Sequence, residues 1–352
     1  MDRSAYLTVL RAFGIAFVLA FLLTPFVKIL AGKIGAVDVP KDGRRMHKSP
    51  TPLLGGLAIF LGFIVSTLLF AERNTQLLSI LAGSVIIVAL GATDDIKPLP
   101  AKPKLVVQIL AALIPVLSGV RVEALTNYNP FSDNPYIVLG VFSIPLTVIW
   151  IVGMTNAVNF IDGLDGLAVG VSSIATLSIL AIALLVSEGA IAVVAAALCG
   201  ACFGFFPFNF NPAKIFMGDT GSTFLGYLLA ALSVHGLFKL YAAISFVVPV
   251  LVFGLPIFDI LFAVVRRVAA GRPPMEADRG HLHHRLIDMG FSHRQTVFIL
   301  YVISAFLGVT AVMLSVFHVS RALLFILCAF AVALIALRST DVRRRAHSRA
   351  RR

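Results

Sequence analysis

Acidic residues are scarce in this chain, and charged residues of every kind are few. Its 352 residues include 17 Asp and Glu, and charged residues make up 13% of the sequence, whereas 59% is hydrophobic. The mean hydropathy is +0.97. Soluble globular domains carry about 25% charged residues, so this composition excludes an ordinary soluble domain. We therefore expect a protein that lies in a membrane.

Cysteine is also rare, with three residues in the whole chain. Cys199 and Cys202 form a CxxC pair, but they lie in an apolar run without a neighbouring Lys or His. Gly200 and Gly204 form a GxxxG pattern in the same run, which is typical of close helix packing in membranes. We interpret this run as a packing site, and redox chemistry is not expected.

Long polar linkers, internal repeats and a soluble domain are missing as well. No small-residue cleavage site follows the first apolar run, so we do not interpret that run as a signal peptide. The expected organisation is one integral membrane domain over residues 1–338 and a basic tail over residues 339–352. We expect the tail to lie on anionic lipid headgroups.

Apolar runs recur along the chain at about the length of 20 residues that a helix needs to cross a bilayer. They predict an all-α, polytopic membrane protein with about eleven transmembrane helices. The expected spans are residues 12–31, 53–71, 77–92, 105–120, 137–155, 167–186, 190–206, 223–238, 241–265, 297–317 and 321–337.

The basic residues predict the orientation. Most of the 29 Lys and Arg lie in the linkers after odd-numbered spans and in the C-terminal tail. Because cytoplasmic loops carry the excess of Lys and Arg, these segments are expected inside and the N-terminus outside. The net charge of +12 reflects this bias, and nucleic acid is not an expected partner.

Five of the aspartates lie in three short linkers on the predicted cytoplasmic side. Asp94 and Asp95 follow the third span, Asp162 and Asp165 follow the fifth, and Asp219 precedes the eighth. Because all three linkers face one side, these carboxylates can converge on one site. Carboxylates close to a membrane need a partner, so the pattern favours a bound divalent cation. For Asp94 and Asp95 alone, a capped helix end beside a solvated loop is the alternative.

The linker after the fifth span has a regular polar spacing. Asn156, Asn159, Asp162 and Asp165 lie three residues apart, which would align them on one helix face. Two glycines among the aspartates favour instead a tight turn whose backbone amides face a ligand. The spacing does not fit an EF-hand. An ordinary Asx turn is the alternative.

Two further linkers have features of phosphate binding. Asp219 lies in a glycine-containing turn that opens a helix, where backbone amides can face phosphate, although no Walker A pattern closes it. His281-Leu-His-His284-Arg285 lies in a basic linker. We favour phosphate over zinc for these histidines because no cysteine accompanies them, and a solvated loop is the third alternative. For Asp259, inside an apolar span, we expect a hydrogen bond within the bundle.

Taken together, these segments resemble the polyprenyl-phosphate N-acetylhexosamine-1-phosphate transferases. The resemblance runs from about Pro25 to Tyr301. The HxHH form is similar to the branch that uses UDP-GlcNAc, and a phospho-MurNAc-pentapeptide translocase is the alternative within the family. The matching motifs are Pro52–Gly56, Asp94–Asp95, Asn156–Ala168, Phe216–Ser222 and His281–His284.

The resemblance implies roles for individual residues. Asp219 would bind Mg²⁺, with Mn²⁺ as a substitute, and Asp94 and Asp95 would help to hold the metal and position or deprotonate the lipid phosphate. The implied catalytic residues are Asp94, Asp95, Asp162 and Asp165. The implied substrate-binding residues are Lys104, Asn156, Asn159, Lys214, Phe216, Arg272, His281, His283 and His284, with Phe216 near the uracil.

The implied reaction joins UDP-GlcNAc and undecaprenyl phosphate to give undecaprenyl-diphospho-GlcNAc and UMP. It would be the first membrane step of a cell-envelope polysaccharide, such as teichoic acid or O-antigen, on the cytoplasmic face of the bacterial cytoplasmic membrane. A phosphate monoester is mostly dianionic at pH 7, which favours direct attack over a phospho-aspartyl intermediate. A homodimer is an open possibility. The rival from another class is an ion-coupled transporter, which would place its acids at mid-membrane.

Overall fold

The computed structural model describes residues 2–39, 50–127, 134, 136–237, 247–269, 271 and 281–316. The described chain is dominated by helices, as expected from the sequence. They are α1 (Arg3–Ile34), α2 (Gly55–Phe70), α3 (Thr75–Ile96), α4 (Ala101–Leu117), η1 (Gly140–Phe142), α5 (Ser143–Ile161), α6 (Leu167–Leu185), α7 (Gly189–Asn209), α8 (Gly218–Leu232), η2 (Ser233–Leu237), α10 (Val247–Val252), α11 (Gly254–Ala269), α12 (Leu282–Asp288) and α13 (His293–Val316).

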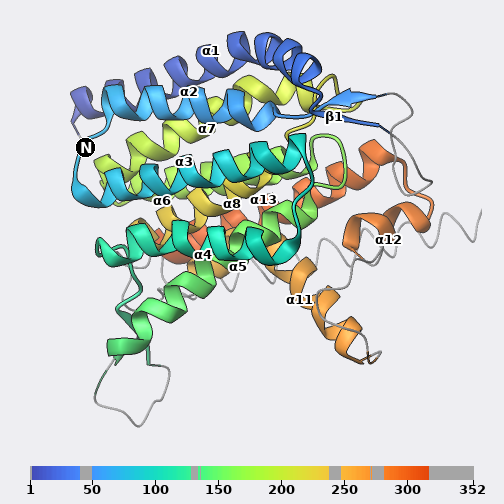
Figure 1. The fold of residues 1–352 in the computed structure, drawn as a ribbon. Coiled ribbons are helices and arrows are strands. Elements are labelled where there is room, and N and C mark those ends of the chain that lie inside the picture. The colour runs from blue at the N-terminus through green and yellow to red at the C-terminus, as the bar shows by residue number, and fades with distance from the viewer. Residues whose placement is uncertain are drawn as a thin grey trace, which may run out of the picture.

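Two small antiparallel sheets accompany the helices. Strand β1 (Val37–Asp38) pairs with β2 (Thr51–Pro52), and β3 (Ala124–Thr126) pairs with β4 (Tyr136–Val138). Figure 1 shows β1 beside one end of the helix bundle, whereas the N-terminus of α1 lies at the opposite end.

Among the described residues, six helices are long and apolar enough to cross a membrane. They are α1, α3, η1 with α5, α6, α7 and α13. These helices confirm an all-α membrane protein, whereas the count of about eleven spans and the orientation of the termini stay predictions. The expected span 321–337 and the tail 339–352 lie outside the described residues. The described part of span 241–265 is divided into α10 and α11.

Helix α8 lies in the centre of the bundle. Every residue from Thr220 to Leu232 is buried, and α8 packs against α2, α3, α5 and α6. In Figure 1, α1, α2 and α7 lie on one side of it and α4 and α5 on the other. The surroundings of α8 therefore position its N-terminal end, where Asp219 lies.

Small residues allow α1 and α7 to pack closely. A Cβ at Gly200 would overlap the carbonyl oxygen of Phe13, and one at Gly204 would overlap that of Phe17. Cys199 and Cys202 are buried free thiols in the same helix. The interpretation of this run as a packing site is therefore confirmed.

Close backbone contacts also surround the N-terminus of α8. A Cβ at Gly91 of α3 would lie within 2.6 Å of the Asp219 carbonyl oxygen, and Gly56 of α2 packs against the backbone of Gly221. The Phe216 N–H donates to the Pro52 carbonyl at 2.8 Å. These contacts hold the start of α8 between the end of α3 and the start of α2.

Candidate active site

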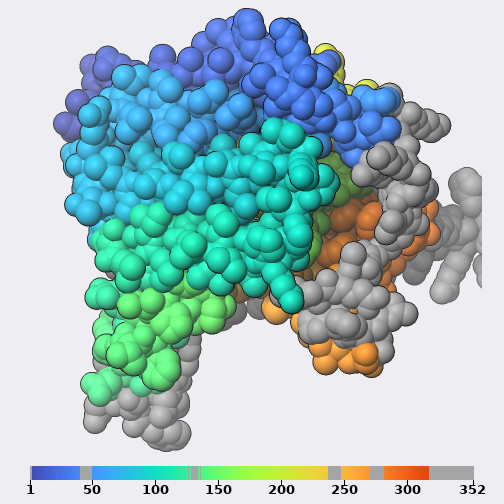
Figure 2. All heavy atoms as spheres, in the orientation of Figure 1, coloured from blue at the N-terminus to red at the C-terminus, as the bar shows by residue number. Residues whose placement is uncertain are grey.

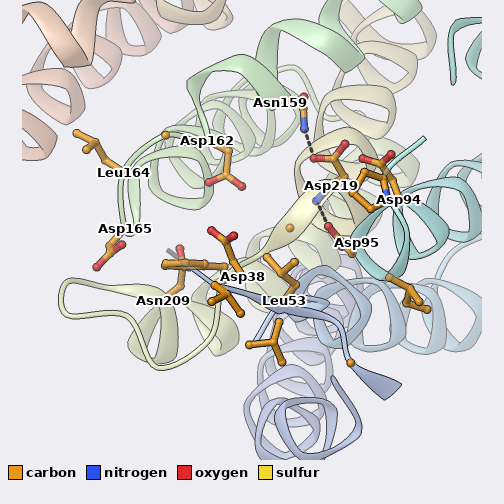
Figure 3. Close-up of a pocket in the computed structure, with 18 of the residues that line it drawn as sticks. Asp38, Leu53, Asp94, Asp95, Asn159, Asp162, Leu164, Asp165, Asn209 and Asp219 are labelled. Atoms are coloured by element: carbon orange, nitrogen blue, oxygen red, sulfur yellow. Dashed lines mark hydrogen bonds between the residues drawn. The ribbon is translucent and has the colours of Figure 1, made fainter. Parts of the chain in front are cut away.

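The three aspartate clusters open into one cavity of about 660 Å³ at the end of the bundle near β1. Asp94 and Asp95 come from the last turn of α3, Asp162 and Asp165 from the turn between α5 and α6, and Asp219 from the first turn of α8. Figure 3 shows the carboxylates of Asp162 and Asp219 directed toward the middle of the cavity. The convergence expected from the linkers is therefore present.

Asp95 holds the first turn of α8 in place. Its Oδ1 accepts a hydrogen bond from the Asp219 N–H at 2.8 Å. Its Oδ2 accepts from the Thr220 N–H at 3.1 Å and from the Thr220 hydroxyl at 2.6 Å. A carboxylate at a helix N-terminus satisfies unpaired amides and interacts favourably with the helix dipole. Asp95 thus fixes the backbone that carries Asp219.

Lys104 of α4 links two of the clusters. Its ammonium group donates to Asp94 Oδ2 at 2.8 Å and to Asp219 Oδ2 at 3.0 Å. Asn159 of α5 donates from Nδ2 to Asp219 Oδ1 at 2.9 Å. We call Asp94, Asp95, Lys104, Asn159 and Asp219 the carboxylate wall. It joins four helices by direct side-chain contacts, as Figure 3 shows in part.

Asp162 faces this wall and differs from its members. Its carboxylate accepts no hydrogen bond from the part of the chain that the structure describes. Burial raises its pKa to about 8, helped by the negative charges of Asp219, Asp95 and Asp165. A carboxylate that faces other carboxylates without a donor of its own favours the entry of a cation.

The turn from 162 to 166 is the tight turn that its glycines predicted. Gly166 has φ +79°, which is strained for other residues, and its N–H donates to Asn209 Oδ1 at 3.1 Å. Asp165 Oδ2 accepts from Asn211 Nδ2 at 2.9 Å and from the Ala213 N–H at 3.0 Å. The turn is therefore anchored to the segment after α7.

The HxHH segment also packs against this turn, at Gly163. His284 lines the cavity, and the His283 ring covers Gly163, where a Cβ would overlap its Nε2. Burial lowers the pKa of His283 to about 3, and the neighbouring His284 charge contributes. His281 and His283 are stacked with ring centroids 5.9 Å apart. We call His281, His283, His284 and His293 the histidine wall. His284 and His293 line the cavity, whereas His281 and His283 lie behind its lining.

Other predicted substrate-binding residues lie in different places. Phe216 lines the cavity, whereas Lys214 is exposed and outside the lining. Asn156 is also outside the lining. It lies between α5 and α4, where its Nδ2 donates to Gln108 Oε1 at 2.7 Å. Arg272 lies outside the described residues. The roles of these four residues stay predictions.

Three lining residues with polar or ionisable side chains were not among the sequence candidates. Asp38 points into the cavity from β1 (Figure 3), Asn209 ends α7, and His293 begins α13. The signal for His293 was its place within the basic His-containing linker. No spacing pattern in the sequence marked Asp38 or Asn209, and Asn209 is joined to the turn after α5 by the Gly166 N–H, 43 residues earlier in the chain.

The donor set fits Mg²⁺. The Lys104 ammonium already lies between the Asp94 and Asp219 carboxylates, which shows that a cation is accommodated there, and the acceptor oxygens of Asp162 face the same space. Among the described residues, no group of three His, Cys, Asp or Glu side chains forms a complete metal site. Mg²⁺ is usually bound by one or two carboxylates together with water and substrate phosphates, and Asp94, Asp162 and Asp219 are carboxylates that line this cavity.

Known proteins are similar in sequence to this chain over most of its length. Residues 77–237 match the family described as glycosyl transferase family 4. A probable undecaprenyl-phosphate N-acetylglucosaminyl 1-phosphate transferase of Bacillus subtilis is 39% identical over 91% of this chain and 89% of its own length. This chain belongs to glycosyl transferase family 4.

Two further proteins are also similar in sequence to this chain. A decaprenyl-phosphate N-acetylglucosaminephosphotransferase of Mycobacterium tuberculosis is 38% identical over 81% of this chain and 77% of its own length. A phospho-N-acetylmuramoyl-pentapeptide-transferase of Desulfitobacterium hafniense is 35% identical over 66% of this chain and 76% of its own length. The family membership inferred from the motifs is confirmed.

Figure 2 shows α1 to α4 as a continuous surface on the viewed face, and dark green and orange segments are visible in a recess at the end near β1. Asp219 of the carboxylate wall and His284 of the histidine wall both line the cavity at this end of the bundle.

Proposed function

We propose that this protein transfers GlcNAc-1-phosphate from UDP-GlcNAc to undecaprenyl phosphate, giving undecaprenyl-diphospho-GlcNAc and UMP. The observation that carries the proposal is the convergence of Asp94, Lys104, Asn159 and Asp219 from four helices at one end of a membrane bundle. The relatives with GlcNAc phosphotransferase names match a larger share of this chain than the pentapeptide transferase does, which favours UDP-GlcNAc as the donor.

Mg²⁺ is the proposed cofactor. When bound, it would neutralise charge on the phosphates that react. Asp219 would hold it, with Asp94 and Asp162 close by, while Lys104 would remain as a second cation for the phosphates. Asp95 would act on the metal site chiefly through the first turn of α8, which it caps.

Direct attack of the lipid phosphate on the sugar-bearing phosphorus is the proposed mechanism. Asp94 accepts hydrogen bonds on both oxygens, from the Leu99 N–H at 2.7 Å and from Lys104 at 2.8 Å. Asp95 is engaged on both oxygens by α8. Carboxylates held in this way are poor nucleophiles but good fixed charges, which suits alignment and electrostatic stabilisation.

The assay that tests the function uses purified protein, undecaprenyl phosphate and a panel of UDP-sugars, with release of UMP as the readout. UMP release with UDP-GlcNAc, stopped by EDTA and restored by Mg²⁺, is the expected result. Release with UDP-MurNAc-pentapeptide alone would assign the protein to the other branch of the family.

We also propose that the cavity faces the cytoplasm, where nucleotide sugars are made. Asn74 begins α3 at the end opposite Asp94, so the two ends can be labelled separately. Single cysteines at 74 and 127, in a background without the native cysteines, should react with an impermeant maleimide in intact cells, and cysteines at 102 and 214 should not. The reverse pattern would contradict this orientation.

A further inference from the structure

A buried carboxylate in α11 lies behind the histidine wall and has no place in the chemistry described above. Asp259 is 2% exposed. Its Oδ2 lies 2.8 Å from Nδ1 of His281, and its Oδ1 accepts a hydrogen bond from the Leu282 N–H at 2.7 Å. Both oxygens of one buried carboxylate are therefore used at the start of α12.

Other contacts hold the same short helix. Phe262, one turn after Asp259 on α11, lies under the guanidinium group of Arg285 at 5.1 Å from the ring centroid. Phe160, at the end of α5, is stacked on the His281 ring with centroids 5.8 Å apart. His281 is thus fixed by Asp259 through its ring nitrogen and by Phe160 through its ring face.

The contact with Asp259 determines which ring nitrogen of His281 carries a proton. An ionised carboxylate only accepts hydrogen bonds, so Nδ1 must be the donor. Nε2 is then the nitrogen that remains for other partners, as an acceptor when the ring is neutral and as a donor when it is charged. Carboxylates behind functional histidines set ring orientation and tautomer in the same way.

We propose that Asp259 is a positioning residue for donor binding. It fixes the orientation and the Nδ1–H tautomer of His281 and so holds the HxHH segment against the turn that carries Asp162. The effect on turnover rests on the proposed function, whereas the effect on the tautomer does not.

Asp259→Asn separates positioning from packing. The amide has the shape of the carboxylate, and its oxygen can still accept from Leu282. Its NH₂ group then faces Nδ1 and donates to it, so the proton of His281 moves to Nε2. Asp288→Asn is the matched control, because Asp288 is an exposed carboxylate on the same short helix.

Kinetics give the first test. For Asp259→Asn we expect KM for UDP-GlcNAc to rise by about tenfold. KM for undecaprenyl phosphate, the Mg²⁺ requirement and the thermal midpoint should stay at wild-type values. Combining it with His281→Gln should add nothing to the His281→Gln defect, because both act through one imidazole. A parallel rise in both KM values together with a fall in the thermal midpoint would indicate a merely structural role and overturn the proposal.

The second test is independent of activity. Nitrogen NMR of the detergent-solubilised protein, labelled with ¹⁵N-histidine, reports each tautomer, and the His281 signals are assigned by their loss in His281→Gln. Wild type and Asp288→Asn should show the Nδ1–H form, and Asp259→Asn should show the Nε2–H form. An unchanged tautomer in Asp259→Asn would overturn the proposal. If the wild type releases no UMP from UDP-GlcNAc, the proposed function fails, and the NMR result still decides the role of Asp259.

Discussion

The carboxylate wall and the histidine wall both contribute side chains to the lining of one cavity, but the side chains of the two walls are held differently. Members of the carboxylate wall bond directly to one another across long helices, as Lys104 does to Asp94 and Asp219. In the histidine wall, His283 and His284 lie on α12, a helix of seven residues that His281 precedes, and His293 begins α13. Helix α12 contacts α11 through Asp259 and Arg285.

This difference suggests a division of labour. Fixed charges that stabilise a reacting phosphate work best when they cannot reorganise, and the carboxylate wall is braced by four helices. Binding of the donor substrate needs less rigid side chains, so it can be carried out by the histidine wall, which is held by fewer contacts. Changes in the carboxylate wall should therefore reduce kcat, whereas changes in the histidine wall should mainly raise KM for the donor.

The largest effect is expected for Asp219→Asn. The change removes the charge at the point where Lys104 and Asn159 converge, and turnover should fall by more than about 10³-fold because the site for Mg²⁺ is lost. The helix should still form, since Asp95 continues to cap it. Near-normal UMP release by the folded variant at low Mg²⁺ would contradict the assignment.

Lys104→Gln should have the next largest effect. Without the ammonium group, Asp94 and Asp219 repel each other, and the phosphates lose a fixed positive charge, so kcat should fall by about 10²-fold. Lys102→Gln, two residues earlier on α4 and exposed, is the control and should behave like wild type. Equal kinetics of the two variants would remove Lys104 from the carboxylate wall.

His284→Ala tests the other wall. Losing one contact with the donor pyrophosphate or sugar should raise KM for UDP-GlcNAc about tenfold, which corresponds to about 1.4 kcal/mol, with little change in kcat. Metal analysis of the purified protein accompanies the kinetics. Stoichiometric zinc that disappears in the variant would show that these histidines bind a metal and not phosphate.

The smallest effect on turnover is expected one helical turn below the carboxylate wall. Gln108 is 3% exposed and is bonded to Asn156, and these residues lie one turn from Lys104 and Asn159. Gln108→Leu leaves Asn156 partly unsatisfied, so the free energy of unfolding should fall by about 1–3 kcal/mol, with only a few-fold loss of kcat. Adding Asn156→Leu should recover part of the stability. A double variant less stable than the single one would contradict this pairing.

Several features of the fold and the site could be read from the sequence. The membrane location, the helical class, the packing site at Gly200 and Gly204 and the turn at Gly163 and Gly166 all follow from local composition. The meeting of three aspartate clusters followed from their position on one predicted side. Each depends on residues close in the chain or on a count of spans, and such information is present in the order of residues.

The roles of individual carboxylates could not be predicted from the sequence. Asp94 and Asp95 are adjacent and chemically identical, yet one binds Lys104 and the other caps α8, 124 residues further on. Asp38, Asn209 and Asp259 carried no pattern that marked them as members or supports of the site. Which side chains meet depends on which helices pack together and on how far each helix is shifted along its axis relative to its neighbours.

The sequence by itself therefore determined that five aspartates of a membrane bundle, Asp94, Asp95, Asp162, Asp165 and Asp219, lie in linkers on one side of it, because isolated carboxylates are too costly to place without a partner near lipid. Only the tertiary structure decided which carboxylate braces a helix, which orients a histidine and which is left to face a cation. A hydrogen bond needs its two atoms within about 3 Å, and distances between segments so far apart in the chain are set by the packing of the helices that carry them.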